Sequence, residues 1–116
     1  MAVKAIRDIL MASPPVVSLV GARVSPVLFA QNTALPCVVL TRVSCTPANH
    51  LHGRPTMDEN HVQLDVFAET YDMARQVADA CRDALEAQDV TMESETDSFE
   101  ADVTEYRVTQ EFLIWT

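Results

Sequence analysis

Residues 61–69 read HVQLDVFAE, and the alternation within this stretch sets the architecture of the chain. Successive side chains of a β-strand point to opposite faces, so residues two apart line one face. The apolar residues at every second position therefore share a face: Val62, Leu64, Val66 and Ala68. Gln63 and Asp65 lie on the other side. We predict a half-buried strand over 61–69, with Phe67 on its outer face.

A helix is predicted directly after this strand, and Thr70 is placed to cap its first turn. Apolar residues then recur at helical spacing on one stripe: Ala74, Val77, Ala78, Cys81 and Leu85. Charged residues occupy the opposite side: Asp72, Arg75, Asp79, Arg82 and Asp83. We predict an amphipathic helix whose apolar stripe faces the core.

Upstream of the strand, a second amphipathic helix is predicted. From Ala2 to Ala12 the apolar residues fall on one stripe, and Pro14-Pro15 ends the pattern because the residue before a proline is pushed out of the α region. Val16 to Val20 is long enough for one further turn. A short apolar run from Val24 to Phe29 precedes Cys37 to Val43, whose β-branched residues predict a strand.

The C-terminal part predicts a β-hairpin, with strands over Val90 to Phe99 and Val103 to Trp115 and a turn around Glu100 to Asp102. Gln110 is the only polar interruption in the apolar face of its second strand: Tyr106, Val108, Phe112 and Ile114. Before the central strand, the turn residues of Thr46 to Asn60 predict a long exposed loop between two strands.

Together these elements predict an α+β fold, in which two helices pack on one face of a mainly antiparallel sheet, with a long loop and a C-terminal β-hairpin. The length suits a single domain over residues 1–116. Lys4, Arg7 and Asp8 interrupt the first apolar stretch, so we expect no secretory signal there. No apolar run is long enough to span a bilayer, and we expect a cytoplasmic protein.

The sequence carries none of the usual catalytic or cofactor signatures. Gly21 and Gly53 are isolated, so there is neither a P-loop nor a dinucleotide fingerprint. Three cysteines without a CxxC spacing argue against a disulfide framework and a zinc knuckle. His50, His52 and His61 are candidate metal ligands, but two of them lie in the polar loop, where solvated histidines are common. We expect no enzyme activity, no cofactor and no metal.

The chain is strongly acidic, with a formal charge of −9 from 17 acids against 8 Lys and Arg. This charge repels a phosphate backbone, so tight binding to free DNA or RNA is not expected. Seven acids and no Lys or Arg lie between Asp89 and Glu105. Among them Glu93, Glu95 and Asp97 lie two apart, which predicts that they project from one face of a strand. Either a solvated face or selection for a negative field accounts for this charge.

Several short segments, taken in order, span nearly the whole chain: Leu35-Pro36, the strand ending in Arg42, His52-Gly53, Val62 to Ala68, Tyr71, Ala74, Ala78 to Leu85, Tyr106 to Thr109, and Phe112 to Trp115. Each segment alone is weak evidence of a family relationship, but their order, their spacing and the aromatic ending together form a specific pattern. In these features the chain resembles the tail-completion, or tail-terminator, family of long-tailed bacteriophages and prophages.

The resemblance implies an α+β subunit that assembles into a ring, usually sixfold, at the head-proximal end of the tail tube. There the ring stops tube growth and joins the DNA-filled head. The implied partners are other copies of the chain, the tail tube protein and the head–tail connector, with DNA passing through the bore without tight binding and no membrane involved. The expected location is the host cytoplasm during assembly and then the virion tail.

Six residues are candidates for the contacts of such a ring: His52, Arg54, Glu93, Glu95, Asp97 and Trp115. His52 and Arg54 lie at the centre of the predicted loop, and the three acids lie on the predicted hairpin. Trp115 is either a core or edge residue of the sheet or, if exposed, an aromatic contact between subunits.

Two functions of other classes remain as alternatives. A regulatory α+β module that binds a small ligand generally needs glycine-rich turns, and this chain lacks them. An acidic DNA mimic that inhibits a nuclease or repressor needs carboxylates spread at phosphate-like spacing, whereas many of the acids here gather on one hairpin.

Overall fold

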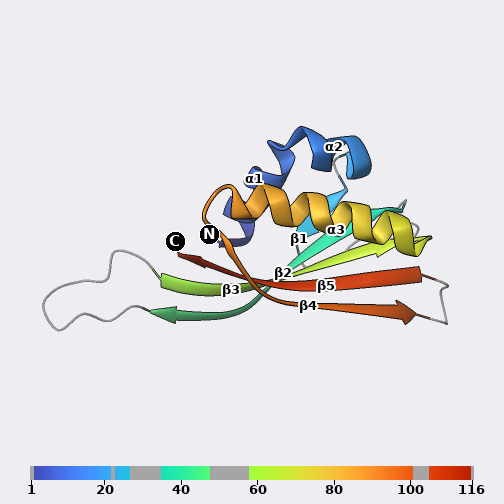
Figure 1. The fold of residues 1–116 in the computed structure, drawn as a ribbon. Helices are drawn as coiled ribbons and strands as arrows, with labels where there is room; N and C mark the ends of the chain where they lie inside the picture. The colour runs from blue at the N-terminus through green and yellow to red at the C-terminus, as the bar shows by residue number, and fades with distance from the viewer. Residues whose placement is uncertain (1, 22, 27–34, 48–57, 101–104, 116) are drawn as a thin grey trace, which may run out of the picture.

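The computed structural model describes residues 2–21, 23–26, 35–47, 58–100 and 105–115. Within them the chain forms helices and strands in the following order (Figure 1): α1 (Ala2–Met11), α2 (Pro14–Val20), β1 (Val24–Pro26), β2 (Cys37–Pro47), β3 (Asp58–Ala68), α3 (Tyr71–Glu86), β4 (Thr91–Glu100) and β5 (Glu105–Trp115). None of these helices is long and apolar enough to cross a membrane.

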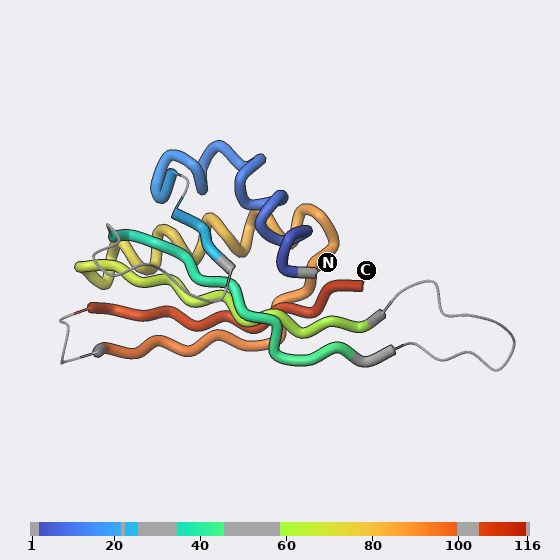
Figure 2. Tube along the Cα trace, turned by 180° about the vertical axis from the view of Figure 1, so that it is seen from behind, coloured from blue at the N-terminus to red at the C-terminus, as the bar shows by residue number. Residues whose placement is uncertain are grey.

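The five strands form one sheet in the order β1-β2-β3-β5-β4. β1 pairs with β2 in parallel, and every other neighbouring pair is antiparallel. All three helices lie on the same side of this sheet, as the front and back views show (Figures 1 and 2). The predicted α+β class and the mainly antiparallel sheet are confirmed, and α2 is a third, short helix where one further turn was expected.

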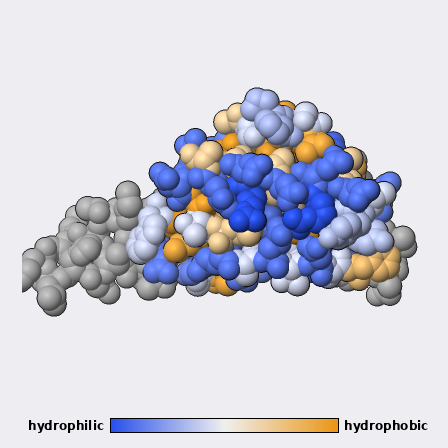
Figure 3. Space-filling model, viewed as in Figure 1, coloured by the Kyte–Doolittle hydropathy of each residue, from blue (hydrophilic) through white to orange (hydrophobic). Residues whose placement is uncertain are grey.

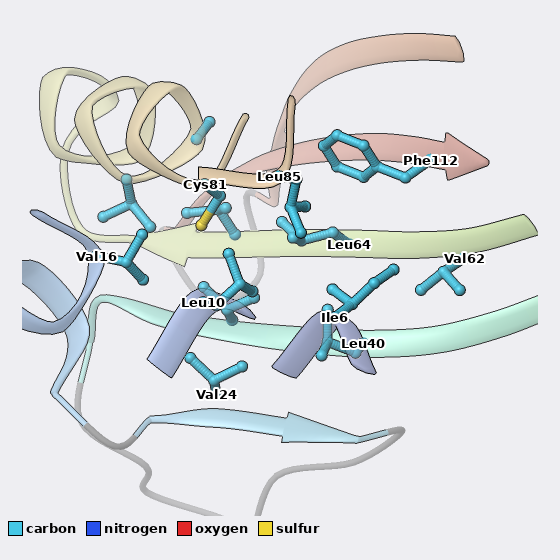
Figure 4. Close-up of a cluster of buried hydrophobic side chains, with 14 of the residues drawn as sticks. Ile6, Leu10, Val16, Val24, Leu40, Val62, Leu64, Cys81, Leu85 and Phe112 are labelled. Atoms are coloured by element: carbon cyan, nitrogen blue, oxygen red, sulfur yellow. The ribbon is translucent and has the colours of Figure 1, made fainter. Parts of the chain in front are cut away.

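The core lies between this sheet and the helices, and the alternation in β3 accounts for it. The four apolar residues of the pattern are fully buried, as predicted: Val62, Leu64, Val66 and Ala68. Ile6 and Leu10 of α1 point into the core, and Phe112 of β5 adds the largest buried side chain (Figure 4). Burial of this apolar surface is the main stabilising contribution to the fold.

The starts of α3 and α2 are set by residues in or next to their first turns. The Thr70 hydroxyl accepts a hydrogen bond from the Met73 backbone N–H at 3.2 Å, which confirms the predicted cap of α3. All five residues of the predicted stripe of α3 are buried. α2 has a proline in its first turn, where the missing N–H leaves no intrahelical bond unmade.

β2 extends beyond its predicted C-terminal end, and β3 begins before its predicted N-terminal end. Pairing of β2 with β3 continues to Pro47 opposite Asp58, so both ends of the predicted loop over Thr46 to Asn60 are strand. That prediction was wrong at its ends because cross-strand pairing overrides the turn preference of single residues. Residues 48–57 lie outside the described residues, as does the predicted hairpin turn at 101–102.

Gln110 is fully buried, although it is the polar interruption of an apolar face. Its side-chain Nε2 donates to the Ala78 carbonyl of α3 at 3.1 Å and to Glu95 Oε2 of β4 at 2.7 Å. These bonds satisfy the side-chain nitrogen, which would otherwise cost free energy on burial, whereas Oε1 has no partner among the described residues. Gln110 thereby connects α3, β4 and β5.

Candidate assembly surface

The side of the sheet away from the helices is covered by no helix or strand among the described residues (Figure 2). We call it the open face. It carries the outward side chains of the two central strands: Glu59, His61, Gln63, Asp65 and Phe67 of β3, and Arg107, Thr109, Glu111, Leu113 and Trp115 of β5. The open face is largely polar, so it is not a second core face.

Asp65 lies on the open face and is nevertheless buried, with 4% of its surface exposed. One carboxylate oxygen accepts from Arg107 Nε at 3.0 Å and from the Thr109 hydroxyl at 2.6 Å. The other oxygen accepts from Gln63 Nε2 at 2.8 Å. The Arg107 guanidinium also lies over the Phe67 ring, 5.5 Å from its centroid. These contacts replace the water that the carboxylate loses.

Asp65 was predicted only as an outward polar position of the strand, and this network was not predicted. The network joins residues more than forty positions apart in the chain, which periodicity does not relate. Pairing of Asp65 with Thr109 and of Phe67 with Arg107 across β3 and β5 brings them together. Predicting the network would have required knowing which residues of β3 and β5 lie opposite each other.

His61 lies between two carboxylates on the open face. Its Nδ1 is 2.6 Å from Glu93 and its Nε2 is 3.0 Å from Glu59. Hydrogen bonds to Glu59 and then to Glu93 raise the pKa of His61 above its ordinary value, which favours an imidazolium that donates to both.

This arrangement does not form a metal site. The two carboxylates lie at opposite nitrogens of one ring, so they do not converge on a common point. Among the described residues no group of three or more His, Cys, Asp or Glu side chains could hold a metal ion. His50 and His52 lie outside the described residues.

The three hairpin acids do not share a face, which corrects the prediction. β4 has a register shift between Met92 and Ser94, so Glu93 is an extra residue in a bulge. The bulge places Glu93 on the open face beside His61. Beyond the bulge the alternation reverses, and Glu95 and Asp97 pair with residues of the buried, helix-side face of β5.

Arg75 of α3 neutralises part of the hairpin charge, which the sequence reading took as unbalanced. Its guanidinium contacts Glu95 at 3.0 Å, Asp97 at 3.3 Å and Asp79 at 2.7 Å. The Tyr71 hydroxyl donates to Asp97 at 2.9 Å, and this bond raises the pKa of Tyr71. Glu95 and Asp97 therefore connect β4 to α3, a role that spacing alone did not predict.

Exposed apolar side chains lie near the two ends of the long strands. At one end Phe99 and Tyr71, each nearly half exposed, contact Tyr106, with ring centroids 4.8 and 6.0 Å from it. A hydrophobic area is visible at the end of β4, beyond the hydrophilic residues that cover α3 (Figure 3). At the other end Trp115 is 49% exposed, as a subunit contact requires.

The remaining candidates divide between the core and the undescribed part of the chain. His52 and Arg54 lie outside the described residues. Cys37 and Cys81 are buried, and burial raises the pKa of their thiols to about 11 and about 12, so they are poor nucleophiles. Cys45 is free and exposed on β2.

Comparison with known proteins identifies the family. The family model described as "Tail completion protein gp17" matches residues 4–116. Among solved structures, a chain of the "Virion of native gene transfer agent (GTA) particle" is similar to this one, with a TM-score of 0.79 and 18% sequence identity. The similarity covers 93% of this chain and 88% of that one, which shows a shared fold. A comparison with curated proteins finds no match.

The family match confirms the resemblance seen in the sequence, and it includes both the open face and the helix layer. A family of tail completion proteins is a family of structural virion components, in keeping with a surface of ion pairs, carboxylates and exposed aromatic residues. Because the match extends over nearly its whole length, this chain belongs to the tail completion protein family of bacteriophages.

Proposed function

We propose that the protein closes the tail tube as a hexameric ring that matches the sixfold symmetry of the tube, and that it joins the tail to the head. The family match over residues 4–116 is the observation that carries this proposal. The partners are further copies of the chain, the tail tube protein and the head–tail connector. Assembly takes place in the host cell, and the ring remains in the virion.

The oligomer tests this proposal. Each subunit of a ring contacts its two neighbours through two different surfaces. The ring closes when the successive rotations add up to a full turn. Native mass spectrometry at high protein concentration should find a closed hexamer, and negative-stain microscopy should show a ring at the head-proximal end of tails. A ligand-dependent dimer would favour a regulatory module instead. A monomer or dimer bound tightly to a basic enzyme would favour a DNA mimic.

We also propose that the open face lines the bore. Glu93 lies on this face beside His61, and Glu59 and Glu111 add further carboxylates. Repeated around a ring, these acids would form a negative collar that does not bind the phosphates of passing DNA. Glu95 and Asp97 have no part in this collar, because they pair with Arg75 on the helix side.

The segment that contains His52 and Arg54 is our proposed contact with the tube or the connector. β2 and β3 lead into it as a long antiparallel pair that ends at Pro47 and Asp58. Replacing residues 49–56 with a short turn should leave the fold intact, since the turn residues Asn49, Gly53 and Pro55 are typical of a loop outside the core. Tails made with the shortened protein should overgrow or fail to join heads. Normal virions would show that the segment makes no such contact.

A further inference from the structure

The two sides of the molecule carry opposite charge. Residues 2–26 and 37–47, which include α1, β1 and β2, hold four basic residues and one acid, Asp8. The basic residues are Lys4, Arg7, Arg23 and Arg42. α3 and β4 hold eight acids and two arginines. The strand order places β1 and β2 at one edge of the sheet and β4 at the other.

Both edges retain backbone groups without a strand partner among the described residues. β4 pairs only with β5, so its other side is unpaired along Thr91–Glu100. β1 covers β2 only from Val38 to Leu40. Within the part of the chain that the structure describes, residues 41–47 of β2 pair with β3 and with no other strand, and we call them the open segment of β2. Unpaired strand edges are templates for pairing with another chain.

The open segment of β2 also carries exposed side chains that suit a contact. Val43 is 56% exposed, which is high for an apolar residue within a strand. Arg42 is exposed and makes no ion pair with any described residue. Arg42 pairs with buried Val62 of β3, so it lies on the helix side of the sheet, the side that also carries Glu95 and Asp97.

The strand directions allow the two edges to meet. β2 runs antiparallel to β3, β3 to β5, and β5 to β4, so β2 and β4 run in opposite directions. Rotation of a copy about an axis parallel to the strands leaves the direction of each of its strands unchanged. A neighbour generated in this way presents its β2 antiparallel to β4, with the helix sides of both sheets facing the same way.

We propose that neighbouring copies in the ring join edge to edge, with β4 of one copy against the open segment of β2 of the next. The occupant of each edge is thus a second copy of this chain, and the inference rests on the ring proposed above. The interface is heterologous, so it propagates from copy to copy until the ring closes. Arg42 then faces the carboxylates of the adjacent β4.

Charge also explains why the edges do not pair in other ways. Two β4 edges would bring like charges together, which opposes a symmetric dimer through β4. The bulges at Glu93 and Val43 disturb regular pairing along each edge and so limit uncontrolled aggregation. The acidic edge therefore accepts a basic edge in preference to a copy of itself.

Reversal of one charge tests the electrostatic part. Arg42→Glu places an acid against the acidic edge and should weaken ring formation by about tenfold or more in native mass spectrometry and sedimentation. Arg82→Glu makes the same change of charge on α3, at the acidic side, and should leave assembly unchanged. Circular dichroism checks that both variants fold. Equal weakening by the two variants would overturn the proposal.

Disulfide crosslinking tests the pairing itself. In a Cys45→Ser background, Ser44→Cys is combined in turn with Ser94→Cys, Thr96→Cys or Ser98→Cys, all exposed positions on the open face. Adjacent strands lie about 4.8 Å apart, within the range that a disulfide bridges. Mild oxidation should give a ladder of covalent oligomers with one of these pairs. Ser44→Cys with Ala12→Cys on the helix side should give none.

The outcomes separate this inference from the proposed function. A hexamer that gives no ladder with any of the three pairs would leave the ring in place and overturn the edge-to-edge contact. A wild-type protein that forms no oligomer, together with cysteine variants that give no ladder, would defeat both. A ladder that ends at six links, together with loss of assembly in Arg42→Glu, supports both.

Discussion

At the scale of single residues, Asp65 shows how a charge is held on an exposed side of a sheet. Three side chains donate hydrogen bonds to it, and its own side chain is only 6% exposed. Arg107, its cationic partner, keeps 32% of its side chain exposed. The pair lies at the boundary between protein and solvent. Hydrogen bonds to a charged group stabilise a fold more than hydrogen bonds between two neutral groups do.

We predict that Asp65→Ala lowers the free energy of unfolding by about 1–3 kcal/mol, because Arg107, Thr109 and Gln63 lose their shared acceptor. Asp79→Ala is the matched control. Its carboxylate is 61% exposed, and exposed ion pairs contribute about 0.5 kcal/mol or less. Urea denaturation of the three proteins measures both effects. Equal losses in the two variants would contradict a special role for Asp65.

His61 predicts a dependence of stability on pH. Because the pKa of His61 is raised above 6.5 in the folded chain, its stabilising contribution is fully present below about pH 6.5. It is lost as the pH rises through the raised pKa. His61→Gln should therefore destabilise the protein more at low pH than at high pH, as chemical denaturation across this range would measure.

An NMR titration of the His61 ring provides the direct test of this site. Glu93→Gln and Glu59→Gln each remove one carboxylate and should each lower the pKa of His61. The native protein should titrate above the ordinary value of 6.5. A titration at or below that value would show that the two hydrogen bonds are not formed in solution.

At the scale of elements, α3 and β4 are joined through Arg75. The arginine lies on the outer side of the predicted helix stripe, but its side chain is only 25% exposed because β4 lies beside it. Tyr71 adds a second link through Asp97, and Gln110 adds a third from beneath. Helix and hairpin are thus connected by polar contacts at the border of the core.

We predict that Arg75→Met lowers the free energy of unfolding by about 1 kcal/mol, since it leaves Glu95 and Asp97 without their cation. Arg82→Met removes an arginine that pairs only with Glu86 in the same helix, and should cost about 0.3–0.5 kcal/mol. In a double-mutant cycle, Glu95→Gln should recover part of the loss caused by Arg75→Met. Strict additivity of the two changes would show that the pair is not coupled.

At the scale of the whole molecule, the helices shield one side of the sheet and leave the other for contacts. The open face carries Glu93 and Glu111, and the helix side carries the charges of α3. A ring in which the open face lines the bore would therefore present carboxylates to DNA and helices to the outside.

We predict that Glu59→Lys with Glu111→Lys, both on the central strands of the open face, leaves ring formation intact but slows DNA ejection or packaging in finished particles, because lysines lining the bore would bind phosphates. The delay should shrink at higher salt, since release of counterions drives such binding. Asp72→Lys with Asp83→Lys makes the same change on α3 and should have little effect. Ejection kinetics of wild-type speed in the first variant would defeat the bore assignment.

The sequence by itself determined most of the helices and strands and, for β3 and α3, the side that enters the core. Alternation in β3 and helical spacing in α3 are local patterns, and both predicted the buried residues correctly. The Thr70 cap is local too, since donor and acceptor lie three residues apart. Such features depend on backbone geometry that neighbouring residues share, so they can be read without knowing the fold.

Only the tertiary structure decided how the charges are distributed. The bulge at Glu93 arises from pairing with β5, and one extra residue moves Glu95 and Asp97 to the other face. Burial of Asp65 depends on Arg107, which reaches it only because β3 and β5 pair in one register. Contacts between residues far apart in the chain depend on that register, and single-strand spacing contains no information about it.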